Sequence, residues 1–286
     1  MKTVSLELAD IIDCILFYYT EHKQVSTKYI ELKSDLSALV EIAYSQTISP
    51  LITFNSECIF ELPYRSMGAI NTTHLFGIDE IIILSFYLKN RNRYKNVLDL
   101  GANIGLHSIV LGKLGYNVRA YEADPDTYDV LLSNIKLNNL VNVEAINSAV
   151  ASYDGEAEFT RVCGNLTGSH LSGAKSHPYG ELEKFSVNVV GISQYFELFD
   201  LVKMDIEGQE ADVFCSIPFT TLAKVDIIME INGDDNALAV FQYANMACVN
   251  LFVQRNAWSK ALTLEDLPRS HRDGSVFVTS KDSMPW

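Results

Sequence analysis

The segment DLGANIGLHS, residues 99–108, contains residue types that could hold a cofactor where a strand ends and a helix begins. Gly101 and Gly105 bracket the turn, and glycine allows positive φ and close approach of a ligand to the backbone. An ordinary strand-to-helix turn would also explain this glycine pair. The dinucleotide fingerprint GxGxxG is not present, because Asn103 stands where its second glycine belongs. Without that glycine, a pyrophosphate could not come close to the backbone. Asp99 would in addition repel a phosphate and attract an ammonium group.

Two further positions complete a binding pattern for a nucleoside. Glu122 closes the next predicted strand, where an acid can accept hydrogen bonds from both ribose hydroxyls. Ser148 and Ala149 belong to a third predicted strand and could lie beside an adenine. A ligand with ribose, adenine and an ammonium group but no phosphate is S-adenosylmethionine. The order and spacing of these residues predict that cofactor.

Acidic residues crowd a second segment, KMDIEGQE, residues 203–210. S-adenosylmethionine is a methyl donor, and transfer of its methyl group is an in-line displacement, so the site needs alignment and, for an acceptor that loses a proton, a base or a bound cation. Asp205 is the first candidate for the base, because the end of the fourth parallel strand faces the cofactor's methyl group. Glu207 is a second catalytic candidate, although it and Glu210 could instead be favourable charges in the first turn of a helix, stabilised by about 0.3–1 kcal/mol.

A long polar segment and a further acid add two alternatives. Residues 161–184 interrupt two predicted strands with glycines, hydroxyls and histidines, which is typical of a substrate-binding loop. His170 in this loop is the alternative general base, since imidazole titrates near neutrality; an exposed histidine without a role is the other interpretation. Glu230 ends another predicted strand, and Asp205 and Glu230 could share Mg²⁺, a hard cation that takes oxygen ligands.

The elements that must position these residues follow from hydrophobic periodicity. Short apolar strands alternate with helices from about residue 78, which predicts an α/β fold with a mostly parallel sheet covered on both faces. Ligands bind beyond the carboxyl ends of such strands. Residues 1–75 are expected to be an N-terminal helical extension with a short hairpin at 51–62, and 76–286 the catalytic domain. The strand predictions are 96–100, 117–122, 142–150, 201–205, 225–231, 250–254 and 275–280.

The N-terminal segment has apolar residues at helical spacing from Val4 to Tyr19, and a second helix is expected to begin at Ser34 or Asp35. A stripe with no evident partner indicates a lid or a homodimer formed through the N-terminal helices.

Composition excludes several classes of function. Lysine and arginine number 22 against 36 acids, a net charge of −14, which argues against a nucleic-acid partner. No apolar run approaches the roughly 20 residues of a membrane span. The five cysteines are far apart and form no CxxC pair, so neither a zinc cluster nor a disulfide framework fits. With no secretory signal pattern at the N-terminus, the sequence predicts a cytoplasmic protein.

The motifs DLGANIGLHS, YEADP (121–125), NSAV (147–150) and VKMDIEGQE (202–210) resemble the FkbM family of class I S-adenosylmethionine-dependent methyltransferases. The resemblance covers about residues 75–235. It implies a Rossmann-like, seven-stranded sheet with a reversed last strand, and O-methylation of a hydroxyl, often on a sugar, glycan or other metabolite. A methyltransferase fold used for binding or scaffolding without turnover is the alternative.

The resemblance also implies roles for individual residues. The methionine end of the cofactor would lie against Asp99, Gly101, Asn103 and Gly105, the ribose against Glu122, and the adenine near Ser148 or Ala149. The predicted cofactor-binding set is completed by Ala102, His107, Ser108, Ala123 and Asp205. Of these, His107 is expected to cap or pack at the start of its helix rather than perform chemistry.

Overall fold

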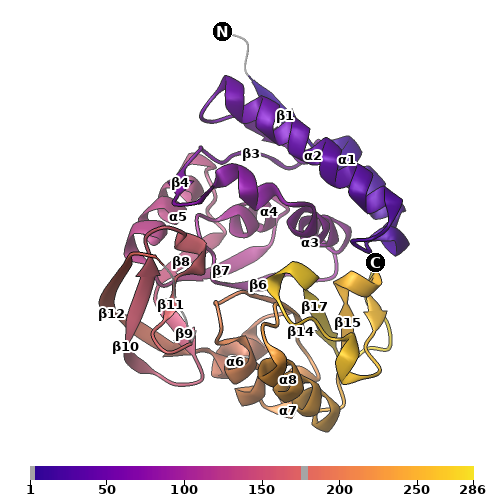
Figure 1. Ribbon diagram of the computed structural model, residues 1–286, viewed down its shortest axis with the longest axis vertical. Coiled ribbons are helices and arrows are strands. Elements are labelled where there is room, and N and C mark those ends of the chain that lie inside the picture. The colour runs from indigo at the N-terminus through magenta and orange to yellow at the C-terminus, as the bar shows by residue number, and fades with distance from the viewer. Residues whose placement is uncertain (1–3, 175–179) are drawn as a thin grey trace.

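The computed structural model describes residues 4–174 and 180–286, and its centre is an eight-stranded sheet in the order β16-β15-β17-β14-β13-β6-β7-β8 (Figure 1). β17 runs antiparallel to both of its neighbours, whereas β6, β7, β8, β13 and β14 are mutually parallel. The predicted parallel sheet with a reversed last strand is confirmed, and the two-residue β16 is added at its edge. The strands are β6 Asn96–Leu100, β7 Asn117–Glu122, β8 Val143–Asn147, β13 Leu201–Met204, β14 Asp226–Met229, β15 Asn250–Val253, β16 Ser259–Lys260 and β17 Val276–Thr279.

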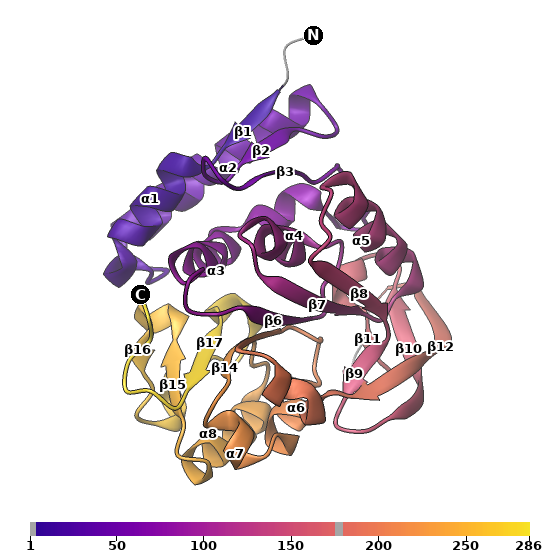
Figure 2. The same ribbon diagram turned by 180° about the vertical axis from the view of Figure 1, so that it is seen from behind.

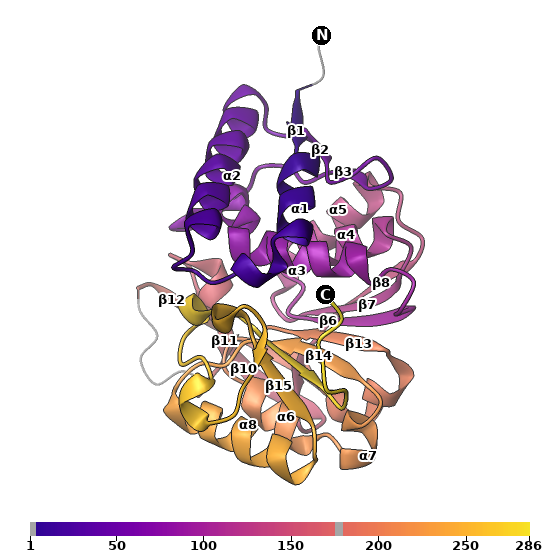
Figure 3. The same cartoon turned by 90° about the vertical axis from the view of Figure 1, so that its right-hand side faces the viewer.

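Helices cover both faces of this sheet (Figure 3). Successive residues of a strand point to opposite faces, so Leu201 packs in one hydrophobic cluster and Val202 in the other. Burial on both faces explains the continuous apolar runs of the sequence. One face carries α3 Ile78–Lys89, α4 Leu106–Lys113 and α5 Pro125–Leu137, and the other carries α6 Glu210–Ser216, α7 Phe219–Leu222 and α8 Asp234–Met246.

A smaller sheet lies beside β7 and β8, in the order β11-β10-β12-β9 (Figure 2). The single strand expected over 142–150 is wrong, because the chain leaves β8 at Asn147 and enters β9 after Ser148. The side-chain amide of Asn147 donates to the backbone oxygens of Glu122 and Ala123, which fixes the break beside the end of β7. The strands are β9 Ala149–Ala151, β10 Gly155–Val162, β11 His170–Leu171 and β12 Leu182–Gly191.

The N-terminal residues form a layer of helices and short strands above α3 and α4. The prediction that a helix begins at Val4 is wrong. The chain first forms the strand β1, which pairs parallel with β2, and the helix α1 follows it. The predicted start of the second helix at Ser34 or Asp35 is wrong as well. α2 begins at Thr27, because the Ser26 hydroxyl caps it by accepting a hydrogen bond from the Tyr29 backbone amide at 3.1 Å. β2 and β3 form the hairpin. The elements are β1 Ser5–Glu7, α1 Ala9–Phe17, α2 Thr27–Gln46, β2 Leu51–Thr53, β3 Ile59–Glu61, β4 Ser66–Met67 and β5 Ile70–Asn71.

The apolar stripe of α1 packs within the chain. Ile11, Ile12 and Ile15 are buried in the same cluster as Ile82 and Phe86 of α3. The stripe therefore has a partner, and the observation from which a homodimer was expected no longer stands. None of the helices formed by the described residues has the length and apolar character needed to span a bilayer.

Candidate active site

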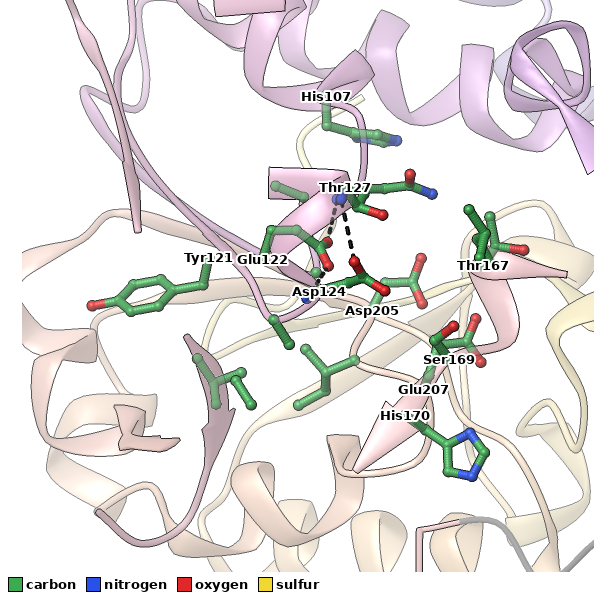
Figure 4. Close-up of a pocket in the computed structure, with 18 of the residues that line it drawn as sticks. His107, Tyr121, Glu122, Asp124, Thr127, Thr167, Ser169, His170, Asp205 and Glu207 are labelled. Atoms are coloured by element: carbon green, nitrogen blue, oxygen red, sulfur yellow. Dashed lines mark hydrogen bonds between the residues drawn. The ribbon is translucent and has the colours of Figure 1, made fainter. Parts of the chain in front are cut away.

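A cavity of about 460 Å³ opens at the carboxyl ends of β6, β7, β13 and β14, which is where an α/β sheet binds its ligands. The smaller sheet and residues 165–171, which follow β10, form its opposite wall. Figure 4 shows Glu122, Asp124 and Asp205 from the main sheet opposite Thr167 and Ser169 of that segment. The volume of the cavity is within the range of about 300–1,000 Å³ that is usual for small-molecule sites.

The glycine turn after β6 brings two strand ends together. Gly101 has a φ of +79°, and a Cβ at this position would lie 1.7 Å from the backbone oxygen of Asp205. The space that glycine leaves is thus filled by the chain's own backbone. This contact holds the turn before α4 against the segment after β13, so both motifs meet at the cavity.

Glu122 lies at the end of β7, where its carboxylate accepts two backbone hydrogen bonds. The Asn103 amide donates at 2.8 Å and the Asp124 amide at 2.9 Å. Burial raises the pKa of Glu122 to about 7, with these two donors and Lys203 acting in the opposite direction. The carboxylate keeps unused lone pairs for a ligand in the cavity.

Most of the predicted cofactor-binding residues line this cavity. They are Gly101, Ala102, Asn103, His107, Glu122, Ala123, Ser148, Ala149 and Asp205. Asp99, Gly105 and Ser108 do not line it. The Ser108 hydroxyl donates to Asp99 Oδ2 at 2.6 Å, and Asp99 Oδ1 is buried without a hydrogen-bond partner among the described residues.

His107 is held by two neighbours at the start of α4. Its Nε2 lies 2.7 Å from Glu80 Oε2, and its Nδ1 lies 3.0 Å from the Tyr87 hydroxyl. Burial acts to raise the pKa of Glu80, but the hydrogen bond and charge of His107 outweigh it and lower the pKa. His107 thus packs and pairs at the helix start.

Lys203 was missed by the sequence analysis, and it is the cation of the site. Its ammonium lies 3.3 Å from Asp205 Oδ2, and Lys203 is one of the residues that line the cavity. Burial lowers the pKa of Lys203, but the charges of Asp205, Asp99, Glu80 and Glu230 outweigh that effect and raise it. The sequence does contain a signal for this role: a lysine stands inside the apolar strand LVKM, and a buried lysine needs acids near it.

Acids dominate the charge of the cavity. Burial and the charge of Asp205 raise the pKa of Glu230 well above its usual range. The described lining contains one lysine, Lys203, and six acids, Glu80, Glu122, Asp124, Asp205, Glu207 and Glu230. The raised pKa of Glu230 favours its neutral form, and Asp124 is paired with Arg161, so the negative charge of the lining comes from the remaining acids. Such a lining favours a cationic ligand and disfavours a phosphate.

Glu210, the first residue of α6, stabilises the turn that precedes this helix. Its two carboxylate oxygens accept from the backbone amides of Ile206 and Gly208, each at 2.8 Å. It therefore holds the turn that presents Asp205 and Glu207. Glu207 itself borders the cavity with a φ of +56°, an unusual conformation for a residue other than glycine.

The other predicted candidates have distinct positions. His170 in β11 borders the cavity, its Nδ1 lies 2.9 Å from the Gly168 oxygen, and its ring points away from Asp205 (Figure 4). Residues 175–179 of the predicted loop 161–184 lie outside the described residues. Among those described, no three His, Cys, Asp or Glu side chains are grouped to hold a metal ion. The magnesium site expected at Asp205 and Glu230 thus gains no support.

A buried ion pair that the sequence analysis also missed joins the two sheets. Arg161 of β10 donates to both carboxylate oxygens of Asp124, at 2.6 and 2.8 Å, and to Glu183 at 2.7 Å. The Arg161 side chain is 13% exposed and that of Asp124 is 4% exposed. This pair fixes the smaller sheet against the start of α5 and so fixes the width of the cavity.

Replacing Arg161 with alanine should lower the free energy of unfolding by about 3 kcal/mol, because the buried Asp124 carboxylate loses its cationic partner and keeps only the backbone amides of Asp126 and Thr127. Chemical denaturation measures this. The matched control is Arg119→Ala, since Arg119 pairs with Glu144 at the surface and its loss should cost less than about 1 kcal/mol. Equal effects of the two variants would contradict this role of Arg161.

The model of the family described as "Methyltransferase FkbM domain" matches residues 99–262, more than half of the chain. The chain belongs to the FkbM family of methyltransferases. The resemblance predicted from the motifs covered about residues 75–235; the match begins later, at residue 99, and ends later, so that it includes α8 and β15. The expected class I methyltransferase fold is confirmed by the strand order and the reversed β17.

One curated protein is similar to a short part of this FkbM-family chain. An uncharacterized protein of Methanocaldococcus jannaschii is 38% identical over 58 residues, which are 20% of this chain and 22% of that protein. The chain thus matches about a fifth of the length of this curated relative.

Solved structures similar to the chain include methyltransferases with bound cofactor. The O-methyltransferase of Bacillus cereus in complex with SAH has 14% identity and a TM-score of 0.37, covering 68% of this chain and 78% of that one. TYW2 of M. jannaschii in complex with AdoMet has 17% identity and a TM-score of 0.38, covering 81% and 83%. Likeness at this level concerns the fold alone.

Proposed function

We propose that this protein is an S-adenosylmethionine-dependent O-methyltransferase acting on a hydroxyl of a sugar, a glycan or another small hydroxylated metabolite. The observation that carries the proposal is the acid-lined cavity at the carboxyl ends of β6 and β7 in a chain of the FkbM family. The ionised acids of the described lining, which outnumber its one lysine, suit a ligand that carries a sulfonium and an ammonium group. They do not suit a dinucleotide.

The residues of the cavity fit this cofactor. Glu122 keeps acceptor capacity for the ribose hydroxyls, and Ser148 and Ala149 would border the adenine. Asn103 and Gly101 would border the methionine end. The charge that favours an ammonium group there would be Asp99, whose Oδ1 has no hydrogen-bond partner among the described residues. When bound, S-adenosylmethionine supplies a methyl group on a sulfonium sulfur, and the acceptor oxygen forms the new C–O bond as the C–S bond breaks.

Asp205 would take the proton that the acceptor hydroxyl loses. Its backbone lies beside the glycine turn, and its carboxylate is partly exposed and lies 3.3 Å from the Lys203 ammonium. A base is useful only within hydrogen-bond reach of the hydroxyl, and Asp205 belongs to the wall where the two motifs meet. Glu207 and His170 stay as the alternative proton acceptors.

The acceptor end of the cavity would recognise a neutral polyhydroxyl compound. Asn165, Thr167 and Ser169 offer polar groups without charge, and Phe159 and Leu166 offer apolar surface. Hydroxyl and amide groups beside an apolar patch suit a saccharide, which has both polar edges and apolar faces.

Transfer of a labelled methyl group from S-adenosylmethionine to a panel of monosaccharides and methyl glycosides tests this function. Label should appear in a product that survives base treatment, as an ether does and an ester does not. A wild-type protein that binds the cofactor but transfers label to no alcohol, in the panel or in a cell extract, would favour the alternative of a binding or scaffold protein.

Cofactor affinity should increase with pH between about 6 and 8. The pKa of Glu122 is raised to about 7 in the free protein, and a bound cation favours the ionised carboxylate, so binding releases a proton. Affinity should therefore fall about tenfold from pH 8 to pH 6, as Glu122 becomes protonated. Calorimetric titration at several pH values measures this change.

The control for this pH dependence is a pair of variants. Glu122→Gln should weaken binding and flatten the dependence on pH, whereas Glu144→Gln on the exposed side of β8 should leave both unchanged. A dependence that survives Glu122→Gln would assign the titration to another group.

A further inference from the structure

Lys203 is surrounded by acids from four elements. Asp205 lies at the end of its own strand, Asp99 in β6 and Glu230 after β14, and Glu80 in α3 completes the set. The strand itself is buried, and the side chain of Lys203 is 10% exposed. A charge in this position is compensated on several sides, so the ammonium is a fixed cation at neutral pH.

The ammonium is not fully used by the protein. A lysine carries three N–H donors, and within residues 4–174 and 180–286 Lys203 makes one hydrogen bond, to Asp205. Because Lys203 also lines the cavity, the other donors can reach a ligand. The nearest carboxylate to it is the one expected to receive a proton during methyl transfer.

The same cation argues against magnesium at this position. Asp205 and Glu230 were the expected magnesium ligands, yet both interact electrostatically with the Lys203 ammonium. A divalent cation between them would be repelled by that charge and would compete with it for Asp205. The donor set therefore suits a lysine-centred site better than a metal-centred one.

We propose that Lys203 is a catalytic residue that donates a hydrogen bond to the acceptor oxygen and supplies the positive charge for which other enzymes use a metal ion. This inference rests on the proposed O-methyl transfer. As the hydroxyl proton moves to Asp205, negative charge develops on the oxygen, and a fixed cation beside it stabilises that charge. The oxygen's electron pair forms the C–O bond, and the electrons of the C–S bond remain on sulfur.

The position of Lys203 has a consequence that needs no acceptor. A cation at the reacting centre repels the sulfonium of S-adenosylmethionine but not the neutral sulfur of S-adenosylhomocysteine. Lys203→Met should therefore raise the affinity for S-adenosylmethionine, relative to the affinity for S-adenosylhomocysteine, about fivefold. A lysine with only a structural role would change both affinities together.

Calorimetric titration of wild type, Lys203→Met and Lys203→Arg with both compounds is the test, together with methyl transfer to an alcohol of the panel above. Lys203→Met should shift the ratio and lower kcat at least 100-fold, with KM for the acceptor changed less. Lys203→Arg should keep the wild-type ratio and part of the turnover. The surface variant Lys184→Met should change nothing, because Lys184 pairs with Glu158 outside the cavity. Turnover should also survive EDTA.

The outcomes separate the two proposals. An unchanged ratio in Lys203→Met overturns the role of Lys203 whether or not transfer is found, and so does a kcat within threefold of wild type. A shifted ratio in a protein that methylates no alcohol contradicts the proposed function and leaves Lys203 beside the sulfonium. Should Lys203→Met fail to fold, Lys203→Gln removes the same charge but keeps a polar side chain in the strand, and it carries the same expected shift in the ratio.

Discussion

Asp205→Asn should lower kcat for methyl transfer by about 10³-fold while cofactor affinity changes by less than about tenfold. Asparagine keeps the size of the side chain but cannot accept the hydroxyl proton, and general base catalysis contributes about 10²–10⁴-fold. The backbone contact between Asp205 and Gly101 does not involve the side chain, so the architecture of the cavity is kept. Single-turnover transfer of a labelled methyl group, with a saturating acceptor, measures the effect.

The matched control for this variant is Asp212→Asn. Asp212 is an exposed acid in the first turn of α6, only a few residues from the cavity, and its loss removes the same charge from the same segment. It should leave kcat within about twofold. If Asp205→Asn keeps more than a tenth of the wild-type rate, the proton is accepted elsewhere, and Glu207 and His170 become the residues to replace.

Gly101→Ala should unfold the protein or lower its free energy of unfolding by at least about 4 kcal/mol. A Cβ at 1.7 Å from the backbone oxygen of Asp205 cannot be relieved by rotating a side chain, so the turn before α4 would have to separate from β13. Cofactor binding should be lost with it. Chemical denaturation and calorimetric titration measure the two effects.

Gly115→Ala separates this clash from backbone strain. Gly115 also has positive φ, +92°, but nothing lies within 4 Å of the position that its Cβ would take. Alanine there should cost only about 1–2 kcal/mol, the price of a left-handed backbone. A similar loss for both variants would mean that the contact between the two motifs contributes little.

The alternation of strands and helices was predictable because each central strand is buried on both faces and therefore appears as an apolar run in the sequence. The positions of Gly101, Glu122 and Asp205 at strand ends followed from the same alternation, since parallel strands place their carboxyl ends at one edge. The family resemblance rested on these same segments.

What the sequence did not reveal depends on long-range contacts. The break at Ser148 arises because Asn147 bonds to the end of β7, and β1 forms because β2 lies beside it. The roles of Lys203 and Arg161 likewise depend on acids that come from other elements. No local pattern carries such information.

The binding of S-adenosylmethionine to the wild-type protein is the most direct test of the central claim, because the acid-lined cavity is assigned to that cofactor. Calorimetric titration at pH 8 should give one site per chain with micromolar affinity, and NAD should give no binding because its pyrophosphate meets the acids. Absence of binding by S-adenosylmethionine in the folded protein would contradict the account.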